Sequence, residues 1–198
     1  MEIRYERRRF AKLLGVSEPQ LAAADARPDL ASLGGGPDWY QLQHLSAYRR
    51  ALNCHPRRRP LRRQLFLNFK GGTGKTSLSV AYAFRLAETG HRVLLIDLDS
   101  QGHATQHLGF GAENFERTLF DTLVGGVPME DVIVRTPLAE FDLLPANLRM
   151  TTIDISLMPM AGREYKLQRA LARVSDRYDF VVMDAPRRRS RSARPIST

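Results

Sequence analysis

The residues best suited to chemistry lie in one glycine-rich run, KGGTGKTS at 70–77. Glycines allow successive backbone N–H groups to face a single anion, and a lysine neutralises its outer charges. Two lysines beside the start of a helix are unfavourable without an anion, because the helix end already carries partial positive charge. The run therefore predicts a phosphate site that begins at Lys70 and contains Gly71, Gly72, Thr73, Gly74, Lys75, Thr76 and Ser77.

A strand must lead into this run and a helix must follow it. The apolar run from Leu65 to Phe69 predicts a buried strand. Apolar residues then recur at helical spacing from Leu78 to Leu86, and Gly90 suits a helix C-cap. Strand, glycine loop and helix are the context in which such a loop holds a nucleotide. A glycine turn without a ligand is the alternative, and the second lysine argues against it.

Carboxylates follow two later apolar runs. Asp97 and Asp99 lie at the end of RVLLIDLDSQG (92–102), and Asp184 ends FVVMD (180–184). A carboxylate at the carboxyl end of a parallel strand faces the crevice where ligands bind, and it can hold Mg²⁺ through water. For Asp97 and Asp99 the alternative is a pair of solvated carboxylates at a strand end. For Asp184 the alternative is a cap before the next element.

These motifs together resemble the ParA and MinD class of P-loop ATPases. The standard P-loop pattern G-x-x-x-x-G-K-[ST] fails because Phe69 stands at its first glycine, whereas Lys70 to Thr76 is similar to the deviant Walker A pattern K-G-G-x-G-K-[ST] of that class. The run from Asp97 to Gly102 resembles the switch I pattern D-x-D-x-Q-G. The segment that ends in Asp184 resembles the Walker B strand.

The resemblance implies ATP and Mg²⁺ as ligands and gives the site residues their roles. Lys75 would contact the β and γ phosphates, Thr76 would bind Mg²⁺, and Asp97 and Asp184 would lie near the metal. Lys70 would reach across a dimer interface to the nucleotide of a second copy. Asp99 would orient or activate the attacking water, so the residues implied to be catalytic are Lys70, Lys75 and Asp99.

The resemblance covers residues 65–186, and members of that class continue into a second half of the domain. Here an arginine-rich run of twelve residues follows Pro186. The abrupt change in composition predicts a truncated gene or a shift of reading frame, with weak nucleotide binding at best. The tail at 187–198 has five arginines and no acidic residue, which predicts disorder.

Length and composition limit the remaining choices. The 198 residues allow one ordinary domain and a small satellite, and 43% hydrophobic content is typical of a globular chain. Cys54 is the single cysteine, which excludes an internal disulfide. No apolar run is long enough to span a bilayer. We therefore expect an α/β fold: a P-loop NTPase half-domain with a mostly parallel sheet, preceded by a small helical domain, in a cytoplasmic protein.

The first 64 residues carry 13 Lys and Arg against 6 Asp and Glu, whereas residues 65–186 carry 12 against 15. Within this basic region, Arg9 to Leu21 predicts a helix, a turn at Gly15 and a second helix with a capping box from Ser17 to Gln20. The pattern resembles helix-turn-helix units, and Trp39 to Arg50 resembles the wing and following helix of MerR-like domains.

We interpret residues 1–53 as a DNA-binding region and 54–64 as a basic linker to the ATPase part at 65–186. The predicted phosphate contacts to DNA are made by Arg7, Arg8, Arg9, Arg49 and Arg50. A helical hairpin with a solvated basic face is the alternative for this region.

The whole sequence thus predicts a ParA-like partitioning ATPase of chromosomes or plasmids, associated with the nucleoid. ATP would close a homodimer that binds DNA, and a ParB-like protein would stimulate hydrolysis. One alternative is a DNA-binding regulator with an inactive ATPase half. Another is a MinD-like or cobyrinate-amidating relative, although the tail lacks the apolar face of a membrane-binding helix.

Two smaller features are interpreted as structural rather than functional. His103 and His107 are spaced like a zinc-binding pair but lack a third ligand, so we expect solvated or core histidines. Leu157, Met158 and Met160 are predicted to fill the core.

Overall fold

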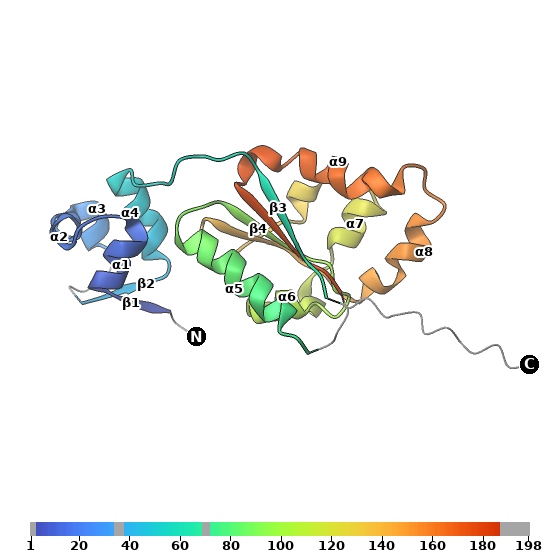
Figure 1. Cartoon of the computed structure of the whole chain (residues 1–198), viewed down its shortest axis with the longest axis horizontal. Helices are drawn as coiled ribbons and strands as arrows, with labels where there is room; N and C mark the ends of the chain where they lie inside the picture. The colour runs from blue at the N-terminus through green and yellow to red at the C-terminus, as the bar shows by residue number, and fades with distance from the viewer. Residues whose placement is uncertain (1–2, 34–37, 69–71, 187–198) are drawn as a thin grey trace, which may run out of the picture.

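The computed structural model describes residues 3–33, 38–68 and 72–186. It contains an N-terminal unit, formed by residues 3–33 and 38–52, and an α/β part that begins at Arg62 (Figure 1). An extended segment, residues 53–61, joins the two. Among the described residues no helix is both long and apolar enough to cross a membrane.

The N-terminal unit contains the predicted helix, turn and helix. Strand β1 (Arg4–Glu6) pairs antiparallel with β2 (Trp39–Gln41), and α1 (Arg7–Leu14) follows β1 directly. Gly15 ends α1 at a φ of 72°, which favours glycine. Helix α2 (Glu18–Asp25) starts with the capping box between Ser17 and Gln20. Helices α3 (Pro28–Ala31) and α4 (His44–Leu52) complete the unit.

An aromatic cluster forms the core of this unit. The ring of Phe10 stacks on Tyr40 at a centroid distance of 4.2 Å and meets Tyr48 edge-on at 5.2 Å. The hydroxyls of both tyrosines donate to the carboxylate of Asp25, each at 2.8 Å. Arg7 pairs with the same carboxylate at 2.9 Å. These contacts join α1, α2, β2 and α4 into one packed body.

A mostly parallel sheet forms the α/β part, which confirms the predicted fold class. Within the described residues its strand order is β3-β7-β4-β6-β5. The strands are β3 (Arg62–Phe66), β4 (Val93–Asp97), β6 (Phe141–Leu144) and β7 (Phe180–Asp184), all parallel, with β5 (Val134–Arg135) antiparallel at the edge.

Helices cover both faces of this sheet (Figure 1). Along β4, Val93 and Leu95 point toward α5 (Lys75–Glu88), whereas Leu94 and Ile96 point toward α7 (Leu119–Leu123) and α9 (Lys166–Ala172). Helix α6 (His103–His107) packs against α5 and β4, and α8 (Ile153–Leu157) packs against the 3₁₀ turn at Leu148–Thr152. Other 3₁₀ turns lie at Ala112–Asn114, Met129–Asp131, Arg163–Tyr165 and Ser175–Arg177.

Several local predictions need correction. The strand before the loop is Arg62–Phe66 rather than Leu65–Phe69, and it is an exposed edge strand in which Leu65 is 54% exposed. Helix α5 buries its small-residue face, Ser79, Ala83 and Ala87, while Leu78 is exposed. Met158 is 66% exposed and therefore does not fill the core.

A buried polar network joins the N-terminal unit to the α/β part. Arg49 on α4 is fully buried, donates to the backbone carbonyl of Glu88 at the end of α5, and lies 3.4 Å from the carboxylate of Glu140. Ser46 donates to Glu140, and the Tyr5 hydroxyl donates to the Glu88 side chain. Burial lowers the pKa of Arg49, and the Glu140 carboxylate opposes this shift. The end of α5 is thus fixed to α4.

We expect Arg49→Met to destabilise the chain by about 3–5 kcal/mol, because it leaves the Glu140 carboxylate buried without its cation. Arg49→Met combined with Glu140→Gln should recover a large part of that loss, since no uncompensated charge then remains. Urea unfolding followed by circular dichroism measures both. Additive costs in the double variant would show that the two groups do not form a pair.

Candidate nucleotide site

The phosphate loop ends where α5 begins. Gly72 and Gly74 have φ values of 74° and 73°, which side chains rarely adopt. Gly74 is the N-cap residue of α5, and its carbonyl accepts the first bond of the helix, from the Leu78 N–H. The free N–H groups at this helix start and the partial positive charge of the helix point at the loop, an arrangement that favours anions.

The key contact of the site joins this helix start to strand β7. The Lys75 Nζ lies 2.7 Å from Asp184 Oδ1, and the Thr76 hydroxyl donates to Asp184 Oδ2 at 2.7 Å. Asp184 is fully buried, and in the sheet register it lies opposite Phe66, the last residue of β3. The carboxylate therefore partners both the lysine and the hydroxyl that the family resemblance assigns to phosphate and Mg²⁺.

Asp97 lies beside Asp184, because the two are register partners at the carboxyl ends of β4 and β7. Asp97 Oδ2 accepts hydrogen bonds from the Thr105 N–H at 2.9 Å and the Thr105 hydroxyl at 2.8 Å, and Oδ1 accepts from the Asp99 N–H at 3.0 Å. Burial raises the pKa of Asp97, and the three hydrogen bonds oppose that shift. Asp97 thus fixes the turn between β4 and α6.

The oxygen donors at these strand ends fit Mg²⁺. Mg²⁺ binds through one or two carboxylates, substrate phosphates and retained waters rather than through a cage of protein ligands. Thr76, Asp97 and Asp184 offer a hydroxyl and two carboxylates of this kind. Among the described residues no cluster of three histidine, cysteine or carboxylate side chains forms a complete metal cage.

A hollow of about 180 Å³ lies in front of the loop. Asp99 borders it together with Lys75. Two histidines that sequence reasoning set aside, His103 and His107, also border it. The complete lining is Gly72, Thr73, Gly74, Lys75, Thr76, Ser77, Asp99, His103 and His107.

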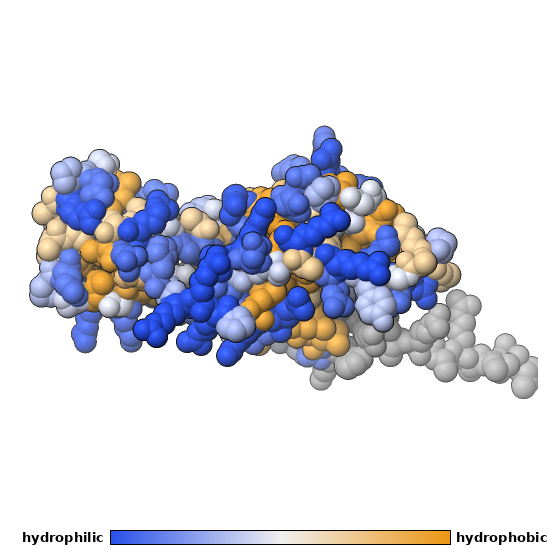
Figure 2. Space-filling view, turned by 90° about the horizontal axis from the view of Figure 1, so that it is seen from above, coloured by the Kyte–Doolittle hydropathy of each residue, from blue (hydrophilic) through white to orange (hydrophobic). Residues whose placement is uncertain are grey.

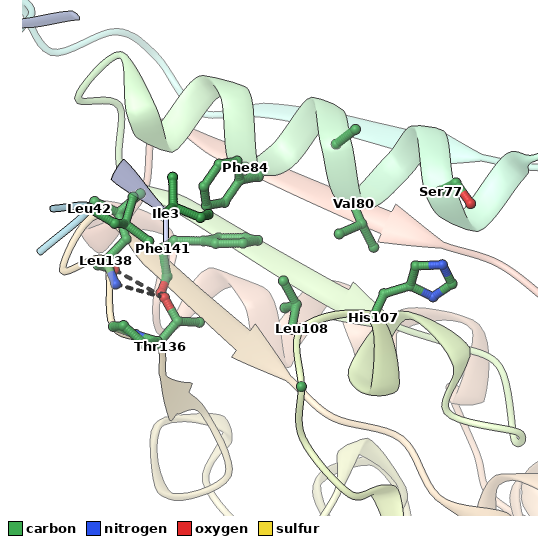
Figure 3. Close-up of a pocket in the computed structure, with 13 residues that line it drawn as sticks. Ile3, Leu42, Ser77, Val80, Phe84, His107, Leu108, Thr136, Leu138 and Phe141 are labelled. Carbon is green, nitrogen blue, oxygen red and sulfur yellow. Dashed lines mark hydrogen bonds between the residues drawn. The ribbon is translucent and has the colours of Figure 1, made fainter. Parts of the chain in front are cut away.

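A larger pocket of about 460 Å³ adjoins this hollow and is mainly apolar. It runs along α5 from Ser77 to Phe84, with His107 at one end and Ile3 and Leu42 of the N-terminal unit at the other (Figure 3). Because its lining offers few polar groups, we assign phosphate chemistry to the smaller hollow. Lys70 and Gly71 lie outside the described residues.

The five arginines predicted to contact DNA differ in their exposure to solvent. Arg8, Arg9 and Arg50 are exposed, and Arg7 is partly buried by its pair with Asp25. Arg49 is a correction: it is fully buried in the network described above, so it cannot reach a DNA phosphate in this arrangement.

The mostly parallel α/β sheet and its glycine loop have the fold of P-loop NTPases. A family model described as an AAA domain (AAA_31) matches residues 64–193. The chain belongs to this family, whose matched relatives include ParA-like ATPases.

The chain is 50% identical over 182 residues to the cell division protein PomZ of Myxococcus xanthus, which covers 92% of this chain and 54% of PomZ. It is 40% identical over 119 residues to the sporulation initiation inhibitor protein Soj of Bacillus subtilis, covering 60% of this chain and 47% of Soj. The chain therefore spans about half the length of these relatives.

Among solved structures, the chain resembles cobyrinic acid a,c-diamide synthase of Mycobacterium smegmatis with bound ATP analog and magnesium. The TM-score is 0.61 and the identity 38%, over 64% of this chain and 51% of the other. The apo McdA structure, at a TM-score of 0.60 and 23% identity over 65% of this chain and 51% of that one, shows the same fold. Nucleotide and magnesium binding is thus observed in a solved relative of this fold.

We expect Thr105→Val to destabilise the chain by about 1–3 kcal/mol, because the Asp97 carboxylate then loses a hydrogen bond inside the protein. Thr105→Ser keeps the hydroxyl and should lose much less. Thermal unfolding of both variants tests this. A larger loss in Thr105→Ser than in Thr105→Val would mean that packing of the Thr105 methyl group, and not its hydroxyl, stabilises this turn.

Proposed function

We propose that this chain binds ATP with Mg²⁺ and hydrolyses it as a ParA-like partitioning ATPase. The observation that carries the proposal is the contact of Lys75 and Thr76 with the buried carboxylate of Asp184 at the start of α5. A lysine, a hydroxyl and a carboxylate in contact at a phosphate loop are the groups that nucleotide binding recruits.

Binding would exchange the partners of this contact. The Lys75 ammonium moves from Asp184 to the β and γ phosphates, and the Thr76 hydroxyl turns toward the metal. Thr76, Asp97 and Asp184 would hold Mg²⁺, the two carboxylates through water, and the metal would supply positive charge against the charge that develops on the phosphate. Asp99 borders the hollow and would orient the attacking water.

A dimer would complete this machinery. Lys70 reaches the nucleotide of a second copy, so ATP closes the pair, and a ParB-like protein stimulates hydrolysis. The support is the lysine that opens the loop in addition to Lys75. The similarity to PomZ and to the chromosome partitioning protein ParA of Caulobacter vibrioides, at 40% identity over 129 residues, adds to it.

DNA binding would use the N-terminal unit, and its target would be the DNA of the nucleoid. Arg8 and Arg9 are exposed at the start of α1, and Arg50 is exposed in the last turn of α4. Arginines of this kind contact phosphates and release counterions, and the second helix of a helix-turn-helix enters the major groove.

We expect Lys75→Ala to abolish binding of a fluorescent ATP analogue to the whole chain, because the phosphates lose their main cation. Lys70→Ala should keep binding to the monomer and lose ATP-dependent dimerisation, which light scattering measures. Retained binding in Lys75→Ala that is folded by circular dichroism would contradict the proposed site.

We expect Arg8→Gln with Arg50→Gln to reduce the slope of log K against log salt for duplex DNA by about 0.9 for each lost phosphate contact. Arg169→Gln with Arg173→Gln, which removes two exposed arginines from the α9 region, is the matched control. Equal slopes in the two double variants would exclude this face. DNA binding that ignores ATP would favour the regulator over the partitioning ATPase.

A further inference from the structure

Helix α6 carries two histidines to the edge of the phosphate hollow. Its residues His103 and His107 are one helical turn apart, and both border the hollow together with Lys75 and Asp99. The His103 ring Nδ1 lies 3.3 Å from Asp99 Oδ2. Figure 3 shows the His107 ring at the end of α6 nearest Ser77 of α5. Two histidines without an evident role in the sequence therefore border the phosphate hollow beside Asp99.

The hydrogen-bond partners of these rings define the role of each Nδ1. A carboxylate oxygen only accepts, so the His103 Nδ1 must carry the proton in its contact with Asp99. The His107 Nδ1 lies 2.8 Å from the backbone carbonyl of His103, which also only accepts. Both rings are thereby held as Nδ1–H donors. The direction of the first contact is from His103 to Asp99.

Packing and hydrogen bonds around α6 hold the backbone of His103 in place. Gly102 has a φ of 63°, and a Cβ there would approach the Ala112 Cβ at 2.7 Å, so the turn before α6 is tightly packed. The Thr105 hydroxyl and N–H bind Asp97, and the Gln106 side chain donates to the Gln101 carbonyl at 2.9 Å. Since Asp97 also accepts from the Asp99 N–H, the carboxylate and the helix share one support.

Asp99 has few other partners in the described part of the chain. Its Oδ1 accepts from the Gln101 N–H at 3.0 Å, and its Oδ2 contacts His103. Lys75, which also borders the hollow, is engaged 2.7 Å from Asp184. Among the described residues, the His103 imidazole is therefore the side-chain partner that the Asp99 carboxylate has.

We propose that His103 is a positioning residue for hydrolysis: its Nδ1–H holds the Asp99 carboxylate in the orientation that directs water toward the terminal phosphate. The inference rests on the proposed ATPase function. It adds to the glycine loop and the strand-end carboxylates one further residue on which turnover depends. Binding of the nucleotide itself depends on Lys75 and the loop, so His103 should affect turnover more than affinity.

Three substitutions separate the possible roles of His103. His103→Asn keeps a donor at the position of Nδ1, because both nitrogens are bonded to Cγ. His103→Gln moves the donor to the position of Nε2, and His103→Ala removes it. We expect kcat to fall about tenfold to a hundredfold in the Ala and Gln variants, the range for losing a hydrogen bond to a charged group. The Asn variant should retain most of kcat, and KM should change little in all three.

The matched control is His55→Ala, which removes an exposed histidine of the joining segment that does not border the hollow. It should leave kcat unchanged. Equal activity of the wild-type chain and His103→Ala would overturn the proposal, as would equal losses in the Asn and Ala variants. A wild-type chain that binds no MgATP would instead refute the proposed function.

Nitrogen-15 NMR of the imidazole rings tests the contact without turnover. In the whole chain at pH 8, His103 should be the Nδ1–H tautomer, and Asp99→Ala should return it to the Nε2–H form that free imidazole side chains favour. A His103 tautomer unaffected by Asp99→Ala would overturn the proposal even in a chain that hydrolyses no ATP. This readout also separates the failure of the contact from the failure of the ATPase.

Discussion

The contact between the start of α5 and the end of β7 is the constraint on which the site depends. Asp184 is buried at a strand end and holds Lys75 and Thr76 at 2.7 Å each. A buried carboxylate needs partners, and in this fold the partners are the two groups that a nucleotide with Mg²⁺ would engage. The same strand register places Asp97 next to Asp184, and Asp97 in turn fixes the turn that carries Asp99 and α6.

Helix α5 connects this contact to the N-terminal unit. The first turn of α5 supplies Lys75 and Thr76, while the carbonyl and side chain of Glu88 at its last residue bind Arg49 and Tyr5. Glu140 before β6 adds a second attachment through Arg49 and Ser46. A single helix therefore has the phosphate loop at one end and the N-terminal unit at the other, and the apolar pocket of Figure 3 runs along its side.

The sequence predicted the groups whose chemistry requires a particular residue type. Phosphate binding requires glycines at 72 and 74, and metal binding requires a carboxylate at 184. These residues, placed after predicted strands, led to the predicted fold class. The bounds of β3 were harder to predict from the sequence, because Arg62 and Arg63 on an exposed edge strand resemble a linker. Arg49 was misplaced because its buried partner, Glu140, is distant in sequence. The position of His103 depends on the packed turn at Gly102; its signal was the helical spacing of two histidines directly after the D-x-D-x-Q-G run.

Isothermal titration calorimetry of the whole chain with ATP, ADP and AMP, each with and without Mg²⁺, tests the central claim most directly. If Lys75, Thr76 and Asp184 form a phosphate and metal site, ATP and ADP should bind, Mg²⁺ should strengthen their binding, and AMP should bind far more weakly because it lacks the β phosphate. Equal binding of all three nucleotides, or binding that ignores Mg²⁺, would contradict the account. So would the absence of any heat of binding from a chain that is folded.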